Sequence, residues 1–196
     1  MKFCLTASLL LLFVSVSIAE EKKDEGKKDS GKKDAKPRLK ADKLGSTRNV
    51  HSFGKNLLCG QPTADDFAEL KKRGIKVVIT LRKKGEVNWD EPGVLKELGL
   101  KFHRFGFQAP DSLKDEIFDK SRKLLNDSKK NPVMLHCGSA NRVGAIWAAH
   151  RVLDHGVSLE DALQEAKVVG LRTPGYRDKA VDYIKRAKAK ASKEKK

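Results

Sequence analysis

Hydrophobic and polar residues alternate in short blocks along the central part of the chain. Continuous apolar runs such as Val77-Val78-Ile79 and Val133-Met134-Leu135 are typical of strands that are buried on both faces of a sheet. Blocks with apolar residues three or four positions apart lie between these runs and predict amphipathic helices. Strands and helices are therefore expected to follow one another in turn.

The predicted strands cover residues 56–59, 76–81, 101–107 and 132–136. The predicted helices cover residues 63–73, 94–98, 112–126, 142–155, 158–169 and a last segment after Gly175. Such an alternation predicts an α/β fold with a central, mostly parallel sheet of about four strands and helices on both faces. Ligands in such folds bind beyond the carboxyl ends of the strands, so the loops after Leu81 and His136 are candidate site loops.

Both ends of the chain depart from this pattern. Residues 1–19 combine Lys2, an apolar stretch and the small-residue end Ser17-Ile18-Ala19, which predicts a cleaved secretory signal and export to the periplasm or the medium. An uncleaved anchor is the alternative; after cleavage no membrane span is expected. Residues 20–47 form a Lys-rich segment with a five-residue repeat and no apolar face, predicted to be a disordered tether. The folded domain is predicted at 48–185, with a basic tail at 186–196.

The net charge of +16 is concentrated in these ends, since residues 44–184 hold 24 basic and 18 acidic residues. Basic flexible ends favour weak binding of anionic surfaces. Nucleic-acid readers also interleave aromatic side chains with the basic ones, and these ends have none, so no specific nucleic-acid binding is expected.

Cysteine usage limits the chemistry further. Past the predicted signal the chain has two cysteines, Cys59 and Cys137, without a CxxC motif, which excludes a zinc ribbon. The histidines lack metal-ligand spacing, and no cofactor is expected. In an oxidising compartment Cys59 and Cys137 could pair, which would silence a reactive thiol.

One segment carries chemistry, the run from His136 to Gly144. A buried strand ends in His136-Cys137, a loop of small residues follows, and Arg142 opens the next helix. The first turn of a helix offers free backbone N–H groups and a partial positive charge, which bind anions and favour the thiolate form of a nearby cysteine. A thiolate beside an anion site is suited to nucleophilic attack on a phosphate ester.

Three segments resemble a known family. Leu58–Thr63, Gly74–Arg82 with Glu86 shortly after, and His136–Gly144 are similar to cysteine-dependent phosphatases of the dual-specificity type. The resemblance is closest to their bacterial branch, often described as dual-specificity-phosphatase-like or beta-lactamase-hydrolase-like. It implies a three-layer protein-tyrosine-phosphatase-like fold and hydrolysis of phosphate monoesters through a phosphocysteine intermediate, with a phosphorylated substrate of unknown class as the partner.

The resemblance assigns a role to each candidate residue. Cys137 is the nucleophile, Arg142 holds the phosphate oxygens, and Asp111 is the general acid, although Asp111 or Ser112 could equally be a helix N-cap. Asp90 or Glu91 is the substitute acid. The expected phosphate-binding residues are Gly138, Ser139, Ala140, Asn141 and Arg142, supported by His136 and Arg82, with Cys59 as a possible redox partner.

Two departures from the family pattern leave alternatives open. Four residues separate Cys137 from Arg142, where the common phosphatase loop has five, and Ala140 stands where glycine is usual. An alanine with positive φ costs about 1 kcal/mol or more. A four-residue loop is also typical of rhodanese-like sulfurtransferases, which would carry a persulfide on Cys137. A non-catalytic module that binds a phosphorylated ligand is the third reading.

Overall fold

The computed structural model describes residues 37–194. The predicted secretory signal and most of the predicted tether lie outside these residues. Within the described range no helix combines the length and the apolar character that crossing a membrane would need.

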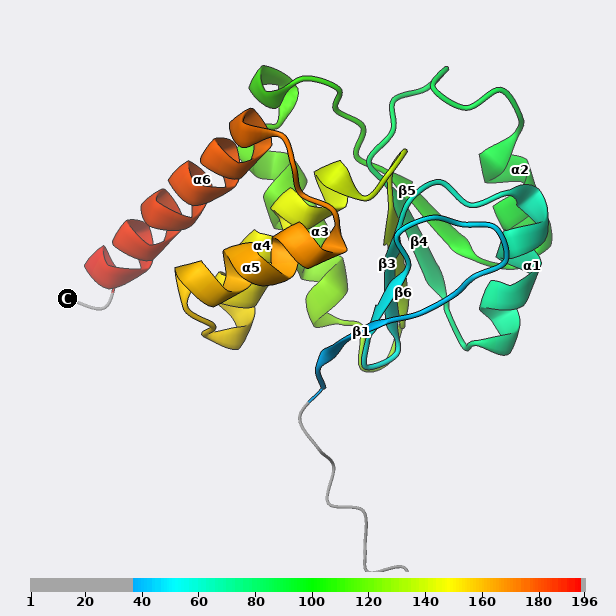
Figure 1. Cartoon of the computed structure of the whole chain (residues 1–196), viewed down its shortest axis with the longest axis horizontal. Helices are drawn as coiled ribbons and strands as arrows, with labels where there is room; N and C mark the ends of the chain where they lie inside the picture. Colours follow the sequence, from blue (N-terminus) through cyan, green and yellow to red (C-terminus); the bar gives the residue numbers. More distant parts are fainter. Residues whose placement is uncertain (1–36, 195–196) are drawn as a thin grey trace, which may run out of the picture. The chain divides into compact units, whose positions relative to one another are not determined.

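A six-stranded sheet forms the centre of the molecule, with the order β1-β2-β3-β6-β4-β5 (Figure 1). The strands are β1 (Leu39–Ala41), β2 (His51–Phe53), β3 (Asn56–Cys59), β4 (Val77–Thr80), β5 (Lys101–Arg104) and β6 (Val133–His136). The strands β3, β6, β4 and β5 are mutually parallel, whereas β1 and β2 join the β3 edge as an antiparallel extension. The α/β fold with a mostly parallel sheet is therefore confirmed.

The number of strands was underestimated, because the sheet has six rather than about four. The two additional strands, β1 and β2, are three residues long and only partly buried. Sequences such as Leu39-Lys40-Ala41 lack both an apolar run and a clear alternation, so hydrophobic periodicity does not reveal them. Pairing with the rest of the sheet is what makes them strands.

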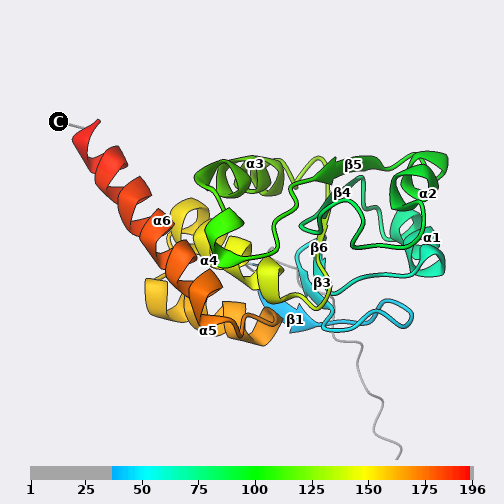
Figure 2. The same cartoon turned by 90° about the horizontal axis from the view of Figure 1, so that it is seen from above.

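Two groups of helices cover the two faces of the sheet (Figure 2). They are α1 (Ala64–Lys72), α2 (Glu91–Glu97), α3 (Asp115–Asn126), α4 (Asn141–His155), α5 (Leu159–Val169) and α6 (Pro174–Lys193), with a short 3-10 helix, η1 (Pro110–Ser112). On one face, α1 and α2 pack on side chains such as Val78 and Met134. On the other face, α3 to α6 enclose a larger core around Ile79, Leu135 and Trp147. Alternate residues of each strand thus enter opposite cores, as parallel strands buried on both faces require.

The folded part begins earlier in the chain than expected. The predicted tether extended to residue 47, but Leu39 lies in β1 and Leu44 is 1% exposed in the core beside α1. These two leucines give the segment an apolar anchor that the repeat before it lacks, and burying them offsets the entropy of ordering the chain. At the other end, α6 continues through the predicted basic tail to Lys193 with exposed side chains.

The register of the central strands places the candidate loops together. Thr80 of β4 and Cys59 of β3 both lie opposite His136 of β6. The chain therefore leaves all three strands at the same edge, through Gly60, Leu81 and Cys137. This is the carboxyl edge at which α/β folds bind their ligands.

Candidate active site

His136 and Cys137 end β6 with their side chains on opposite faces of the sheet. The His136 side chain is fully buried on the α1 side, with its ring centroid 6.0 Å from that of Phe67. Cys137 belongs to the other core, beneath α4, and is 1% exposed. Strand alternation therefore places the two neighbours in different surroundings. The thiol lies on the α4 side of the sheet, and the imidazole lies on the α1 side.

The loop from Gly138 to Asn141 turns the chain sharply into α4. Ala140 adopts a left-handed conformation with φ of 63°, the strained backbone that the sequence predicted for it. Its methyl group is fully buried and lies against Gly170, where an added Cβ would come within 3.2 Å of it. The Gly144 N–H then donates to the Ala140 carbonyl at 3.0 Å, the first hydrogen bond of α4.

Several backbone N–H groups around this turn are left without a protein acceptor. Within residues 37–194, those of Gly138, Ser139, Asn141, Arg142 and Val143 donate no hydrogen bond. The Cys137 N–H, by contrast, donates to the Cys59 carbonyl at 3.3 Å. Buried backbone donors are nearly always paired, and consecutive free N–H groups at a helix start form an anion-binding concavity.

The side chains of Ser139 and Asn141 tie the loop to the segment between α5 and α6. The Asn141 Oδ1 atom accepts from the N–H groups of Arg172 and Thr173, at 2.8 and 3.2 Å, and its Nδ2 donates to Thr173 Oγ1 at 2.7 Å. Arg172 Nη2 donates to Ser139 Oγ at 2.7 Å. Both side chains are therefore occupied in holding the shape of the loop.

Arg142 is held by Glu86 through a paired contact. Its Nη1 and Nη2 donate to the Glu86 carboxylate at 2.9 and 2.7 Å, and Nη1 also donates to the carbonyls of Leu81, at 2.9 Å, and Phe107. Burial lowers the pKa of Arg142, but the hydrogen bonds to Glu86 and the charges of Cys137, Glu86 and Tyr176 together outweigh burial and raise the pKa. The guanidinium therefore stays charged and fixed in orientation.

The orientation of Arg142 leaves one edge of its guanidinium available. A guanidinium has five N–H donors. Glu86 takes the end formed by the two terminal nitrogens, and within the described residues the Nε–H and one Nη2–H make no hydrogen bond. These two donors are parallel and match two oxygens of a tetrahedral anion. Glu86 thus orients the arginine without occupying the edge that an anion needs.

Glu86 forms ion pairs with two arginines, Arg82 and Arg142, at this edge of the sheet. Hydrogen bonds from Arg142, together with the Lys83 N–H and the charge of Arg82, lower its pKa from 4.5 to about 2. Arg82 Nε lies 3.5 Å from its carboxylate. From the sequence, Glu86 was noted only as one of the residues that resemble the family. Its role as the partner of Arg142 depends on the folding of the loop after β4 and was not predicted.

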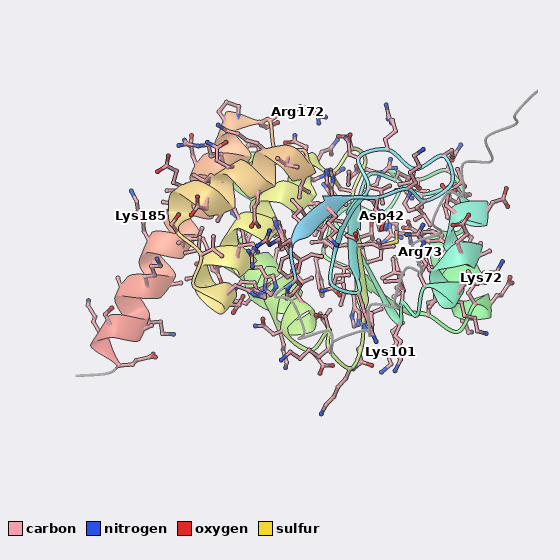
Figure 3. All side chains as sticks on the ribbon, turned by 60° about the horizontal axis from the view of Figure 1, so that its bottom comes forward. Asp42, Lys72, Arg73, Lys101, Arg172 and Lys185 are labelled. Carbon is pink, nitrogen blue, oxygen red and sulfur yellow. The ribbon has the colours of Figure 1, made fainter. Side chains whose placement is uncertain are left out.

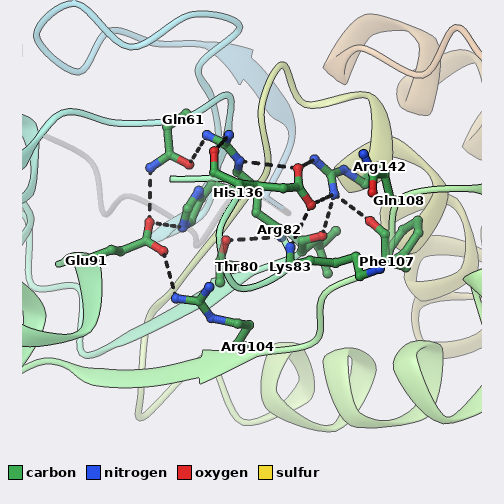
Figure 4. A network of polar contacts seen from close by, with 12 residues as sticks. Gln61, Thr80, Arg82, Lys83, Glu91, Arg104, Phe107, Gln108, His136 and Arg142 are labelled. Atoms are coloured by element: carbon green, nitrogen blue, oxygen red, sulfur yellow. Dashed lines mark hydrogen bonds and ion pairs between the residues drawn. The ribbon is translucent and has the colours of Figure 1, made fainter. Parts of the chain in front are cut away.

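A chain of polar contacts connects the two sides of the site (Figure 4). Arg82 Nη1 donates to Gln61 Oε1 at 2.9 Å, and Gln61 Nε2 donates to Glu91 Oε1 at 3.0 Å. His136 Nε2 lies 3.2 Å from the same Glu91 oxygen, and both side chains are fully buried. Burial raises the pKa of Glu91, but His136, Gln61 and Arg104 outweigh burial and lower it. Arg82 and His136 are thus connected through Gln61 and Glu91, and their supporting role in the site stays a prediction.

The candidate acids lie in three different settings. The Asp111 side chain is 97% exposed on η1, 3.5 Å from Lys179, whereas Ser112 makes the local cap by accepting from the N–H groups of Gln108 and Ala109. Asp90 is the N-cap of α2, and Glu91 is committed to His136. Both substitute acids therefore have structural tasks. The acid role of Asp111 stays a prediction.

Tyr176, in the first turn of α6, was not anticipated from the sequence. Its ring packs edge-on against Phe107 with centroids 5.5 Å apart, and its hydroxyl donates to the Gln108 carbonyl. Burial raises the pKa of Tyr176, while Arg142 lowers it and Cys137 raises it. No local motif marks it, since its position depends on how α6 returns to the loop.

Cys59 and Cys137 are both free thiols. Their side chains belong to the two different cores, on opposite faces of the sheet. Burial raises the pKa of Cys59 well above its ordinary value, with smaller effects from Cys137 and Asp66, so Cys59 is held as an unreactive thiol. The arrangement gives no support to a disulfide between them, and that pairing stays a prediction.

The site therefore combines the buried Cys137 thiol, several backbone N–H groups without a protein acceptor and an oriented guanidinium edge. No group of three His, Cys, Asp or Glu side chains in residues 37–194 is placed to hold a metal ion. The chemistry that these residues can supply themselves is attack by a thiolate on an electrophile that carries negatively charged oxygens.

Comparison with known proteins adds information about the fold. No protein-family model matches this sequence, and no curated protein matches it. Among solved structures, P. aeruginosa TpbA is similar over 75% of this chain and 88% of its own, with 21% identity and a TM-score of 0.59. PTPMT1, in complex with PI(5)P, covers 74% of this chain and 97% of its own, with 19% identity and a TM-score of 0.61.

A third similar structure is the core catalytic domain of the PP-IP phosphatase SIW14 from S. cerevisiae. It covers 74% of this chain and 93% of its own, with 20% identity and a TM-score of 0.58. These neighbours are cysteine-based and protein tyrosine phosphatase-like. The fold that the three short segments implied is thereby confirmed, and this chain has the protein tyrosine phosphatase-like fold.

Proposed function

We propose that this protein is a cysteine-dependent phosphatase that hydrolyses phosphate monoesters through a phosphocysteine intermediate on Cys137. The observation that carries the proposal is the free edge of Arg142, held in place by Glu86 beside the unpaired N–H groups of the loop. Together these donors would hold the oxygens of a phosphate at the loop that follows Cys137. The neighbours support this class, since TpbA has been solved with pTyr and PTPMT1 with PI(5)P, both phosphate monoesters.

The proposed reaction has two displacement steps. The Cys137 thiolate attacks phosphorus and the bond from phosphorus to the ester oxygen breaks, so the leaving oxygen takes a proton from an acid. Water then attacks the phosphocysteine, the sulfur–phosphorus bond breaks, and inorganic phosphate and the thiolate are released while a base accepts the water proton. Arg142 and the loop N–H groups stabilise the charge that grows on the phosphate oxygens in both steps.

Asp111 is proposed as the acid, and the leaving group gives a direct test. An alkyl alkoxide needs protonation, whereas p-nitrophenolate is stable without it. Asp111→Asn should therefore slow hydrolysis of an alkyl phosphate by roughly a hundredfold or more and leave that of p-nitrophenyl phosphate nearly unchanged. Equal effects on both substrates, or none on either, would contradict the role of Asp111.

The decisive experiment compares the two cysteines of the described domain. The reduced protein, Cys137→Ser and Cys59→Ser are assayed for phosphate release from p-nitrophenyl phosphate, after thermal unfolding has shown that each variant is folded. Turnover should be abolished only in Cys137→Ser. Acid quenching of the wild type should trap one phosphoryl group on the peptide that contains Cys137, detected by mass spectrometry.

Other outcomes would select the other readings of the loop. Formation of thiocyanate from thiosulfate and cyanide, without phosphate release, would show sulfur transfer through a persulfide. Phosphate binding without turnover in the wild type and in Cys137→Ser would show a binding module.

Export also belongs to this proposal. It is supported by the signal-like composition of residues 1–19. Expression of the full chain in a bacterial host, followed by cell fractionation and N-terminal sequencing, should find protein that begins near residue 20 outside the cytoplasm. A full-length N-terminus on cytoplasmic protein would contradict export.

A further inference from the structure

A groove of about 360 Å3 lies between the end of α5 and the first turn of α6. Its apolar residues are Leu163, Leu171 and Pro174, and its basic residues are Lys167, Arg172 and Arg177. The groove is not part of the thiol site, and the proposed chemistry makes no use of it. Its position beside the loop, its positive charge and its apolar floor each restrict the kind of ligand that it can bind.

The groove adjoins the loop that holds the phosphate. Arg172 contributes to its wall and also donates to Ser139 of the loop, while the N–H groups of Arg172 and Thr173 donate to Asn141. The start of α6 connects the two places, because Asn141 of the loop donates to Thr173 Oγ1 at 2.7 Å, and both Thr173 and Arg177 line the groove. Figure 3 shows Arg172 on the connection between α5 and α6. Whatever is attached to a phosphate in the loop therefore has the groove as a neighbouring surface.

The groove is strongly basic. Three cationic side chains line it and no acidic residue of the described chain does. Lys167 has no ion pair within residues 37–194, and the partner of Arg177 is its exposed neighbour Asp178, at 3.1 Å. The first turn of α6 contains no acidic residue, so the positive end of its dipole adds to this field. Charge complementarity favours an anionic ligand.

The floor of the groove is recessed and apolar. Leu171 is 6% exposed, and Leu163 is packed against the core beneath it. A membrane-inserting surface would present large apolar side chains that protrude, and among the described residues Val168 alone is a strongly exposed large hydrophobic. A polyphosphate would leave the apolar floor without a partner. A recessed apolar floor with a basic rim instead fits an apolar side chain that is followed by a carboxylate.

We propose that this groove is a substrate subsite, which binds an apolar residue and an adjacent acidic residue of a phosphorylated polypeptide while the phosphate lies in the Cys137 loop. The inference rests on the proposed phosphatase function and names its substrate as a phosphoprotein with an acidic, partly apolar sequence beside the phosphorylated residue. Leu163, Leu171 and Pro174 receive the apolar side chain, and Lys167 and Arg177 pair with the carboxylate.

The test compares substrates and charge reversals. One phosphotyrosine peptide carries Leu and Glu on both sides of the phosphorylated residue, a second has Gln in place of each Glu, and p-nitrophenyl phosphate lacks both groups. The double variant Lys167→Glu/Arg177→Glu is compared with Lys71→Glu/Lys72→Glu, which makes the same charge change on the exposed surface of α1. Lys72 and Arg172 are labelled on separate elements in Figure 3.

The wild type should hydrolyse the Glu peptide with a kcat/KM roughly tenfold above that of the Gln peptide, consistent with the modest strength of exposed ion pairs. The Lys167/Arg177 double variant should lose this preference, while the Lys71/Lys72 double variant keeps it. Both should hydrolyse p-nitrophenyl phosphate like the wild type. Replacement of the peptide leucines by serine should lower kcat/KM in the wild type.

The two proposals fail in distinguishable ways. Absence of p-nitrophenyl phosphate turnover contradicts the phosphatase function, and the groove is then tested by fluorescence anisotropy of the labelled Glu and Gln peptides. If the wild type is active and hydrolyses the two peptides with equal kcat/KM, the subsite proposal is overturned. A preference that both double variants lose alike overturns it as well. Inositol hexakisphosphate and phosphoinositide vesicles are tested as inhibitors of the same variants. If one of them inhibits the wild type but not Lys167→Glu/Arg177→Glu, and the wild type shows no peptide preference, the groove binds a different ligand and the proposal is overturned.

Discussion

Two arginines on adjacent helices bind a carboxylate in opposite ways. Arg122 of α3 uses its Nε and Nη2 to bind Asp154, at 2.8 and 2.7 Å, and its Nη1 donates to Tyr183 at 2.6 Å. Arg142 of α4 uses its two terminal nitrogens to bind Glu86, at 2.9 and 2.7 Å. The carboxylate therefore occupies the side edge of Arg122 but only the end of Arg142.

The difference distinguishes a structural ion pair from one that leaves the side edge of the arginine free to bind an anion. At Arg122 the remaining contacts close the network, because His150 and Asn126 also bind Asp154, each at 3.0 Å. At Arg142 the side edge makes no hydrogen bond within residues 37–194. Similar bond lengths can thus accompany different functions, and the edge of the guanidinium that the carboxylate takes is the distinguishing feature. If this comparison is right, changes at the two arginines should affect different properties.

The largest expected effect is on stability, at the closed network. Asp154→Ala removes the shared acceptor of Arg122, His150 and Asn126 and leaves a mostly buried guanidinium with only the distant Asp119 carboxylate, at 4.0 Å, as an acidic partner. Breaking a buried pair from one side costs about 3 kcal/mol or more, measured as the free energy of unfolding in urea. The folded fraction should keep the kcat/KM of the wild type.

Glu116→Ala, on the exposed surface of α3, provides the control. Its pair with Lys120 is exposed, so the cost should stay below about 1 kcal/mol. If Asp154→Ala were as mild as Glu116→Ala, the network around Arg122 would not be a structural one.

The next effect is on activity, at the open pair. Arg142→Lys keeps the charge but replaces the planar fork by one ammonium, which cannot bind Glu86 and an anion with separate edges. We expect kcat/KM for p-nitrophenyl phosphate to fall roughly 10²- to 10³-fold. Arg122→Lys, the matched change, should lower stability and leave kcat/KM of the folded enzyme nearly intact. Similar kinetic losses in both variants would remove the distinction between the arginines.

A smaller kinetic effect is expected at the acid that orients Arg142. Glu86→Gln keeps the size of the side chain but loses the charge and one of the two acceptors. Misplacing the guanidinium should reduce kcat by roughly tenfold while phosphate still binds, because the charge of Arg142 remains. A KM that rises with unchanged kcat would show that Glu86 contributes to binding rather than to positioning.

The same variant predicts a pH dependence of stability. Folding lowers the pKa of Glu86 from 4.5 to about 2, so its ion pair stabilises the folded state fully above the higher value. As the pH falls from 4.5 to 2, protonation removes that contribution. The stability difference between wild type and Glu86→Gln should therefore be constant near neutral pH and shrink across this acid range. A difference that grows on acidification would have the wrong sign.

Much of the fold could be predicted because its signals are local. The runs at β4 and β6, the capping box of Thr63 and Asp66, and the Gly156 end of α4 each specify their own element. The short strands β1 and β2 could not be predicted, since they are made by pairing with the sheet and not by an apolar run. The buried position of Leu44 likewise depends on α1, which comes later in the chain.

The site could be predicted only as far as one segment extends. Cys137, the loop and Arg142 are consecutive, so their proximity follows from the sequence. The partners Glu86, Gln61 and Tyr176 come from three other loops and helices, and only the fold brings them to the same edge. Their roles are set by tertiary geometry, which neither spacing nor composition encodes.

The smallest expected effect concerns the backbone that leads to Arg142. The residue before α4, Ala140, has φ of 63°, whereas Lys114 before α3 has an ordinary φ of −88°. Ala140→Gly relieves about 1 kcal/mol of left-handed strain but loses a buried methyl group worth about 0.8 kcal/mol and gains chain entropy in the unfolded state. These contributions nearly cancel, so the free energy of unfolding in urea should change by less than about 1 kcal/mol and kcat/KM by less than about twofold.

Gly170→Ala is the informative contrast, because the φ of Gly170 is 136° and the new Cβ would lie 3.1 Å from the Ser139 carbonyl oxygen. It should destabilise the protein clearly and disturb the loop, which would show that Gly170, more than the identity of residue 140, sets the path of the chain into Arg142.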